Sequence, residues 1–275
     1  MRRALLPALL ALGAIAIATP AAARAQERER TAADWLDDCR RGQGWGNDDD
    51  RACEVREVTL PSLNGTLRVD GGPNGGVSLI GWDRKEVKIV ARVSANSRSD
   101  GEAERMLKEI RVLTDGSVRA EGPRSSRGRG WGVSFDIYLP RRADVTAETT
   151  NGGVRAKQVS GRLSLSTTNG GVVLDEVGGD VRAETVNGGV TVRLSGNRFD
   201  GERLEASATN GGVRLEIPEG YNARLEAETT NGGLQTDFPI TLQGRIDRRI
   251  STTLGRGGPL VSVRTVNGGV RIRRI

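Results

Sequence analysis

The sequence contains no histidine, and only 3% of its 275 residues are aromatic. Without histidine, no imidazole can serve as a general base or as a metal ligand. The two cysteines are too few for a four-thiolate zinc or iron–sulfur site. These absences exclude the commonest catalytic and metal-binding arrangements. We therefore expect a non-enzymatic protein with no metal and no other cofactor.

A strong excess of charge of one sign is also lacking. The chain has 41 basic and 35 acidic residues, which gives a formal charge of +6. Three arginines lie in the first 25 residues, which we expect to be removed, and the remainder is 38 basic against 35 acidic residues, or +3. A nearly balanced surface gives little support for a phosphate-binding footprint. Nucleic acid is therefore not an expected partner.

Residues 1–25 have the pattern of a secretory signal peptide. Arg2 and Arg3 precede an apolar stretch at residues 5–18, and Ala23-Arg24-Ala25 is a small-x-small cleavage site. The apolar stretch is shorter than the roughly 20 residues that a membrane-spanning helix needs. No later segment could span a membrane as a helix. The pattern predicts export to the periplasm or to the cell surface of a bacterium.

Export permits a disulfide, and Cys39 and Cys53 are the only cysteines. Only one intramolecular pairing is possible, so we predict a Cys39–Cys53 bond within an N-terminal segment at residues 26–57. The acidic run at residues 47–50 lies between them. It lacks the alternating ligands and terminal glutamate of an EF-hand, so a solvated turn is favoured over a calcium site.

Glycine is abundant, with 38 residues, and much of it belongs to a repeat. Successive Asn-Gly-Gly units are spaced by 18, 18, 23, 21 and 36 residues, and an earlier copy begins at Asn74. The repeated units begin at Asn151, Asn169, Asn187, Asn210, Asn231 and Asn267. Mostly apolar residues recur four and six positions before each asparagine and three and five positions after it, and threonine, with one alanine, recurs two positions before it. Polar residues lie between these columns. This period of two indicates a strand, a turn and a second strand with one buried face.

Recurrence of the same columns every 18 residues is expected if the units stack on one another. We therefore predict an all-β, single-stranded parallel β-solenoid, or β-helix, at residues 141–275. A second turn is expected near Ser160-Gly161 and Gly178-Gly179. The asparagines are expected to form a buried structural ladder of side-chain hydrogen bonds, and the glycines to supply backbone angles that other residues avoid.

Residues 58–140 differ from the repeats and form a second region, a β part with one short helix. Alternating segments predict strands. Residues 99–110 predict the helix, with Asp100 as its cap and Met106, Leu107 and Ile110 on one face. We expect this helix to cover one open end of the solenoid or to pack on its side.

The segments Gly75-Gly76-Val77, 81–87 and Tyr138-Leu139-Pro140, followed by repeated Thr-Asn-Gly-Gly-Val, carry a resemblance. They are similar to a bacterial family of exported β-strand-repeat proteins of unknown function that are described as adhesins. The similarity extends over roughly residues 58–275. It implies a β-solenoid at the cell envelope, and it brings no catalytic residues with it.

Charged residues recur at outward positions of the repeats. They define two possible binding columns: Glu148, Glu184 and Glu228 three positions before the asparagine, and Arg155, Arg214 and Arg271 four positions after it. The simplest interpretation is solvated ladders that keep the protein soluble. The functional hypothesis is an adhesin-like or scaffold-like envelope protein that presents this surface to another envelope protein or to a polysaccharide.

Two alternatives stay open. Parallel β-helices can bind or process polysaccharides, although a glycosidase needs two carboxylates flanking the scissile bond. The C-terminal strand at residues 270–272 has no obvious cap after it, which leaves end-to-end self-association possible.

The signal-peptide pattern generates a first prediction. The protein purified after export should begin near Gln26, because cleavage follows the small-x-small site. Intact mass spectrometry of the exported protein measures this start directly. A mature chain that retains residues 1–25 would contradict the prediction.

Overall fold

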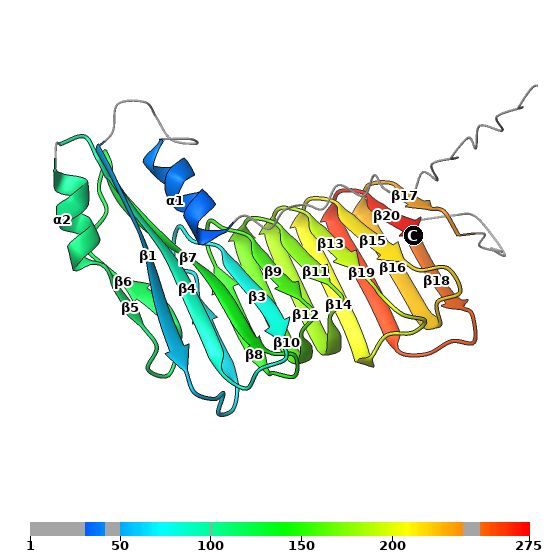
Figure 1. The fold of residues 1–275 in the computed structure, drawn as a ribbon. Coiled ribbons are helices and arrows are strands. Elements are labelled where there is room, and N and C mark those ends of the chain that lie inside the picture. Colours follow the sequence, from blue (N-terminus) through cyan, green and yellow to red (C-terminus); the bar gives the residue numbers. More distant parts are fainter. Residues whose placement is uncertain (1–30, 42–49, 100, 239–247) are drawn as a thin grey trace, which may run out of the picture.

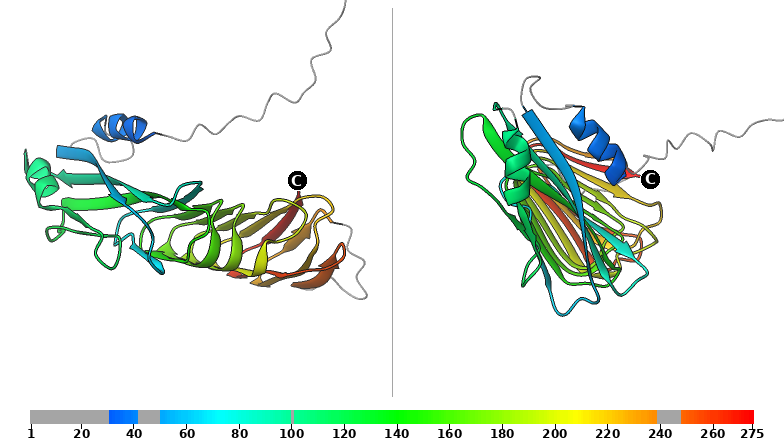
Figure 2. Two further views of the ribbon diagram at one scale, coloured as in Figure 1. Left: turned by 60° about the horizontal axis from the view of Figure 1, so that its bottom comes forward. Right: turned by 60° about the vertical axis from the view of Figure 1, so that its left-hand side comes forward.

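The computed structural model describes residues 31–41, 50–99, 101–238 and 248–275. The predicted signal peptide and the acidic run at residues 47–49 lie outside the described residues. The fold is all-β, as predicted, with strands laid side by side along one long axis (Figure 1). Two further views show both helices at the β1 end of this elongated molecule (Figure 2).

Two large sheets face each other within the described residues. In spatial order, the first consists of β1 (Asp50–Leu60), β4 (Val87–Ser97), β7 (Arg129–Pro140), β3 (Val77–Trp82), β9 (Val154–Lys157), β11 (Val172–Asp175), β13 (Val190–Arg193), β15 (Val213–Ile217), β20 (Val270–Arg274) and β17 (Leu234–Thr236). We call it sheet A.

The opposite sheet, sheet B, consists of β18 (Arg249–Leu254), β16 (Ala223–Asn231), β19 (Leu260–Asn267), β14 (Gly201–Asn210), β12 (Gly178–Asn187), β10 (Ser160–Asn169), β8 (Val145–Thr149) and β2 (Leu67–Asp70). A small hairpin of β5 (Arg111–Leu113) and β6 (Arg119–Glu121) lies apart from both sheets.

Each Asn-Gly-Gly repeat forms what we call a rung: a strand of sheet B, the Asn-Gly-Gly turn and the following strand of sheet A. Neighbouring rungs pair in parallel and in register. Leu163 lies beside Val181, and Asn169 lies beside Asn187. In sheet A, Val172 pairs with Val154 on one side and Val190 on the other. Residues in one column of the repeat therefore lie side by side in space.

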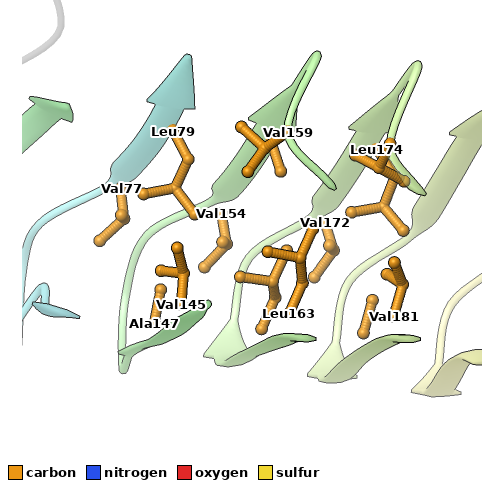
Figure 3. Packing of buried hydrophobic residues seen from close by; sticks show 14 of the residues in the cluster. Val77, Leu79, Val145, Ala147, Val154, Val159, Leu163, Val172, Leu174 and Val181 are labelled. Atoms are coloured by element: carbon orange, nitrogen blue, oxygen red, sulfur yellow. The ribbon is translucent and has the colours of Figure 1, made fainter. Parts of the chain in front are cut away.

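The inward columns form the core between the sheets. Val145, Leu163 and Val181 from sheet B face Val154, Val172 and their neighbours from sheet A (Figure 3). The core runs without a break from Ala52 to Ile272 and consists almost entirely of aliphatic side chains. Small aliphatic residues suit this narrow space, because burial of apolar area stabilises the fold only where the two sheets pack closely.

The sheets are mixed, so the prediction of a purely parallel single-stranded solenoid is wrong in two places. At one end of sheet A, β1 pairs with β4 and β4 with β7 in antiparallel fashion. At the opposite end of the molecule, the edge strand of sheet B, β18, pairs antiparallel with β16. The local alternation of these strands does not reveal their direction, because a period of two is common to parallel and antiparallel pairing.

The order of the last rungs also differs from their order in the sequence. The C-terminal rung, β19 and β20, lies between the rung of β14 and β15 and the rung of β16 and β17. Val270 thus pairs with Val213 on one side and with Leu234 on the other. The C-terminal strand does not end the stack, so residues 270–272 do not provide the uncapped end on which the alternative of end-to-end self-association was based.

The second turn of the rungs lies earlier than predicted. Ser160-Gly161 and Gly178-Gly179 begin β10 and β12, whereas the chain turns at Gln158 and Glu176. Both of these residues have left-handed backbone angles, with φ of 55° and 54°. The Gln158 side-chain amide donates to the Glu176 carboxylate at 2.8 Å, which joins the two turns.

The described residues contain two helices, where one short helix was predicted. α2 (Glu102–Glu109) corresponds to the predicted helix and buries Ala103 and Met106 against β1 and β4. It begins after Gly101, and the predicted cap, Asp100, lies outside the described residues. α2 thus covers the antiparallel end of sheet A, which agrees with the expected capping role.

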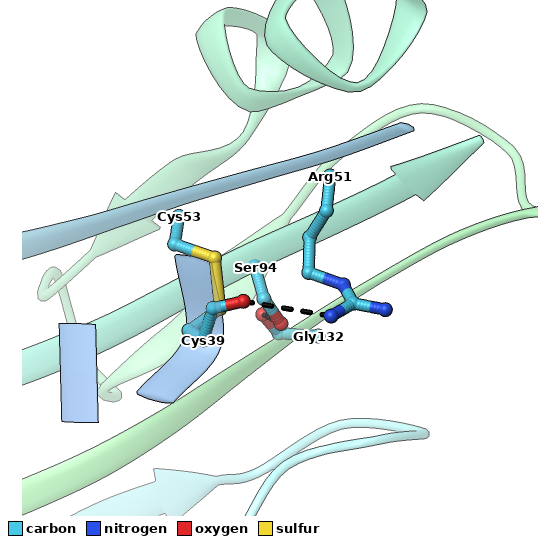
Figure 4. The surroundings of a disulfide bond; sticks show 5 residues. All are labelled: Cys39, Arg51, Cys53, Ser94 and Gly132. Atoms are coloured by element: carbon cyan, nitrogen blue, oxygen red, sulfur yellow. Dashed lines mark hydrogen bonds between the residues drawn. A yellow bond between two sulfur atoms is a disulfide. The ribbon is translucent and has the colours of Figure 1, made fainter. Parts of the chain in front are cut away.

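α1 (Ala32–Arg40) was not predicted, although Thr31 and Asp34 form a capping box at its start. The predicted Cys39–Cys53 disulfide joins α1 to β1, with the two α-carbons 6.4 Å apart (Figure 4). Beside it, the Arg51 guanidinium donates to the Cys39 carbonyl at 3.5 Å. The disulfide fixes a helix that has no fully buried residue of its own.

The inward and outward assignment predicts a sharp difference between two neighbours on β13. Val190 is 1% exposed in the core, whereas Thr191 points outward. Val190→Asp should lower the free energy of unfolding by more than about 3 kcal/mol, because an unpaired charge is buried. Thr191→Asp should cost less than about 1 kcal/mol. Chemical denaturation measures both, and equal losses would contradict the assignment.

Candidate functional site: the asparagine edge and its two grooves

The asparagines of the repeat form one continuous side-chain ladder along the edge between the sheets. The Asn187 amide donates to the Asn169 oxygen at 2.9 Å, and the Asn187 oxygen accepts from Asn210 at 2.9 Å. Beyond Asn210 the ladder passes to Asn267 and then to Asn231, following the spatial order of the rungs. At its other end it includes Asn151 and Asn74.

The prediction that these asparagines are buried is wrong, since the ladder asparagines, including Asn187, are exposed. The side chains lie at the turn, where the chain passes from sheet B to sheet A and no second layer covers them. Water can replace part of each lost hydrogen bond, so a single ladder bond contributes less here than it would in the interior.

The buried polar column is instead the threonine two positions before the asparagine. Thr185 is 4% exposed, and its hydroxyl donates to the carbonyl of Gly170 in the preceding rung at 2.7 Å. The same 2.7 Å bond recurs from Thr167, Thr229 and Thr265 to the corresponding glycines. The bond satisfies a hydroxyl that would otherwise be buried without a partner. Ala208 interrupts the column, because it has no hydroxyl to donate to Gly188.

The first glycine of each unit is required by the close approach of neighbouring rungs. A Cβ on Gly170 would overlap the carbonyl oxygen of Gly152, and one on Gly188 would overlap that of Gly170. Apart from Gly211, with φ of 158°, these first glycines do not have positive φ angles, so the predicted reason for glycine does not hold for most units. The requirement is steric: the neighbouring backbone occupies the place of a side chain.

The second glycine meets a much weaker restraint. A Cβ on Gly171 would lie 3.3 Å from the Gly189 oxygen, and one on Gly233 would meet nothing within 4 Å. These second glycines lie immediately before the sheet A strands, and all of them except the half-buried Gly171 are exposed. Their missing side chains leave the outer surface beside the asparagine ladder hollow.

A shallow groove follows the ladder on sheet B. Its walls combine hydroxyl groups with carboxylates, and it crosses the strands from β2 to β14. The lining residues are Asp70, Glu148, Thr149, Thr150, Ser166, Thr167, Thr168, Glu184, Thr185, Val186, Ser207 and Thr209. We call this the acidic groove. The Glu184 carboxylate is paired with Arg182 at 2.7 Å, whereas the Glu148 carboxylate makes no hydrogen bond or ion pair with the described residues.

A second groove lies across the ladder on sheet A and extends toward the β17 end of the stack. It crosses β13, β15, β20 and β17, and its lining residues are Gly189, Val190, Thr191, Gly212, Val213, Arg214, Gly233, Gln235, Gly269, Val270 and Arg271. We call this the basic groove. The Arg271 Nε donates to the Gln235 side-chain oxygen at 3.1 Å, and the Arg214 guanidinium makes no hydrogen bond or ion pair with the described residues.

The six charged residues singled out from the sequence lie on two different faces. Glu148, Glu184 and Glu228 occupy one outward column of sheet B, but Ser166 separates the first two and Ser207 and Arg264 separate the last two. On sheet A, Arg214 and Arg271 are neighbours, whereas Val173 and Thr191 separate Arg155 from them. The structure therefore brings together one arginine pair rather than a single six-residue site.

Sequence reasoning missed a column of alternating charge on sheet A. Lys157, Asp175, Arg193, Glu216 and Arg273 pair in that order across five rungs. Arg193 binds the half-buried Glu216 at 3.0 Å. The signal was present six positions after each asparagine, but the alternation appears only when the spatial order of the rungs is known.

The groups with clearly shifted pKa values lie outside both grooves. Hydrogen bonding from Arg203 lowers the pKa of Asp180, and a similar bond from Arg141 lowers the pKa of Asp83. Burial raises the pKa of the Tyr221 hydroxyl. The two carboxylates are partners in exposed ion pairs, which have a structural explanation and do not indicate a proton-transfer site.

The comparisons with known proteins fit this fold. The family model described as Toastrack DUF4097 matches residues 93–273, which is more than half of the chain. The chain belongs to this family, in agreement with the resemblance noted from its motifs. No curated protein gives a significant match.

Several solved structures are similar to the chain. One is described as a "putative cell adhesion protein" from Clostridium sporogenes, with 15% identity, a TM-score of 0.44 and coverage of 82% of this chain and 100% of the other. A second is a "putative adhesin" from Bacteroides fragilis, with 12% identity, a TM-score of 0.28 and coverage of 81% and 97%. A "putative lipid binding protein" from Parabacteroides distasonis has 9% identity, a TM-score of 0.26 and coverage of 81% and 96%. Likeness at this level does not assign a function.

In the described part of the chain, no helix has the length and apolar character needed to cross a membrane. No group of three or more acidic or cysteine side chains there is arranged to hold a metal ion.

The two glycines of a unit provide a matched test of stacking. Gly170→Ala should lower the free energy of unfolding by more than about 3 kcal/mol, because its Cβ overlaps the backbone of the next rung. Gly171→Ala should change it by less than about 1 kcal/mol. Both are measured by chemical denaturation. Similar effects at the two positions would show that rungs do not approach at the first glycine.

The interrupted threonine column predicts a stabilising substitution. Ala208→Thr should raise the free energy of unfolding by about 0.5–1.5 kcal/mol, because the new hydroxyl reaches the Gly188 carbonyl as its neighbours do. Ala208→Val adds the same bulk without a donor and is the control. If both variants have the same stability, the threonine bond does not contribute.

The asparagine ladder predicts a difference between its middle and its end. Asn187→Ala removes two ladder bonds and should cost about 1 kcal/mol, since both are exposed to water. Asn231→Ala removes only one and should cost about half as much. Thermal and chemical unfolding of the two variants measure this, and a larger loss at Asn231 would contradict the ladder order.

Proposed function

We propose that this chain is an exported, non-enzymatic protein of the bacterial cell envelope. Its repeat region is a solenoid-type scaffold that holds a partner on its outer surface, in an adhesin-like or structural role. The periplasm or the cell surface is the proposed location, and another envelope protein or a polysaccharide is the proposed partner. The signal-peptide pattern and the membership of the Toastrack family support this proposal.

One observation carries the proposal. Polar and charged side chains stand in register on consecutive rungs and line long, open grooves on both faces of the stack. Such a surface repeats at the strand spacing of about 4.8 Å and suits an extended partner. An enzyme pocket for a small molecule is normally concave, mostly apolar and largely enclosed, which neither groove is.

The experiment measures retention of the mature protein on its proposed partner material. Labelled protein beginning at Gln26 is incubated with isolated cell envelopes, and the bound fraction is measured over a range of protein concentrations. Saturable retention is expected. A protein without the proposed function would stay in the supernatant at every concentration.

A polysaccharide-processing protein is the second candidate. The carboxylates of the neighbouring residues Asp70 and Glu148 favour it, because they lie in the same groove on paired strands and glycosidases use two carboxylates. Release of new reducing ends from envelope polysaccharide would support this candidate. Retention without release supports the binding role alone.

A further inference from the structure

We propose that the basic groove of sheet A binds an anionic polysaccharide whose carboxylate groups pair with Arg214 and Arg271. The inference rests on the proposed binding function and names the class of ligand for one of its two grooves. It depends on the inserted position of the C-terminal rung, which places β20 beside β15 and Arg271 beside Arg214.

The charges of the groove are all of one sign. Arg214 and Arg271 line it, and no carboxylate does. The carboxylate of Glu216, two residues beyond Arg214, is bound to Arg193 at 3.0 Å. Within this groove the surface therefore attracts anions, although the protein as a whole is nearly balanced in charge.

The two guanidinium groups retain donors for a ligand. The Arg214 guanidinium makes no hydrogen bond or ion pair with the described residues, and the hydrogen bond from Arg271 to Gln235 uses only its Nε. Each can present a planar pair of N–H groups, which matches the two oxygens of a carboxylate. The two arginines are neighbours on paired strands about 4.8 Å apart, so successive anionic groups of one chain can reach both.

The floor of the groove favours a linear chain with hydroxyl groups. Gly189, Gly212, Gly269 and Gly233 lie on four consecutive rungs in space and leave a continuous open channel. The Thr191 hydroxyl and the Gln235 amide stand beside it and offer hydrogen bonds to sugar hydroxyls. A Cβ on Gly233 would meet nothing within 4 Å, so packing does not require glycine there.

The test measures the binding of polygalacturonate, a linear polymer of uronic acid, to the mature protein. Fully methyl-esterified polygalacturonate has the same backbone without the charge, and polyphosphate has the charge without the sugar. Binding of polygalacturonate that weakens with added salt, with little binding of the other two, is expected. Equal binding of the ester, or binding of polyphosphate alone, would overturn the proposal.

Variants locate the binding. Arg214→Gln with Arg271→Gln should weaken polygalacturonate binding by at least about tenfold, because charge-assisted hydrogen bonds are lost. The control, Arg162→Gln with Arg224→Gln, removes the same charge from exposed positions on sheet B and should leave binding unchanged. Equal weakening by both pairs would show only a general effect of net charge and would overturn the assignment to this groove.

A third variant tests the floor. Gly233→Leu should weaken binding by several-fold at nearly unchanged thermal stability, since the added side chain narrows the groove and its Cβ meets nothing within 4 Å. Retention of the wild-type protein on cell envelopes distinguishes failure of the proposed ligand class from failure of the proposed binding function. Retention on envelopes without polygalacturonate binding overturns the ligand class alone, whereas the absence of both overturns the proposed function as well.

Discussion

The close approach of neighbouring rungs at the first glycine is the constraint on which the rest of the structure depends. The carbonyl of Gly152 occupies the space that a side chain at Gly170 would need, and the same relation repeats along the stack. At this spacing, the threonine hydroxyl of one rung reaches the glycine carbonyl of the preceding one. The asparagine side chains outside the turn come into hydrogen-bond range of one another for the same reason.

The close packing at the Asn-Gly-Gly turns does not restrict the residue types on the outer faces of the two sheets. The inward columns hold aliphatic residues that are almost completely buried, so their identity is restricted by packing. The outward columns tolerate serine, glutamate and arginine at equivalent positions, as Ser166, Glu184 and Arg264 show. Function in such a scaffold is therefore expected on the outer columns, where a substitution changes the surface without changing the fold.

The sequence predicted which residues of each repeat face the core, but it did not predict which rungs are neighbours in space. Alignment on the asparagines placed Val190 and its counterparts in the core, because a period of two with a fixed spacing leaves no other choice of face. The same alignment could not place the C-terminal rung. The 36-residue spacing between Asn231 and Asn267 is compatible both with a rung that lacks the Asn-Gly-Gly unit and with a segment inserted between two rungs. Strand neighbours that are distant in the sequence are a property of the whole fold.

The candidate site was likewise predictable in part, in its residue types but not in the positions of these residues relative to one another. The residue types of both grooves were visible as outward columns, and the arginines at positions 214 and 271 were among those singled out. Their adjacency was not visible, because it arises from β20 lying between β15 and β17. α1 was overlooked although Thr31 and Asp34 form a capping box, because a helix of nine residues with no buried side chain leaves little apolar pattern.

The spatial order of the rungs is the central claim, and engineered disulfides test it most directly. Glu205 pairs with Ser262 in the described order, whereas stacking in sequence order would place Glu205 beside Glu226. Cysteines at 205 and 262 should form a disulfide on mild oxidation, detected as a linked peptide pair. Cysteines at 205 and 226 should not, because they are two strands, about 9.6 Å, apart. Efficient linkage of 205 to 226 without linkage of 205 to 262 would contradict the structure.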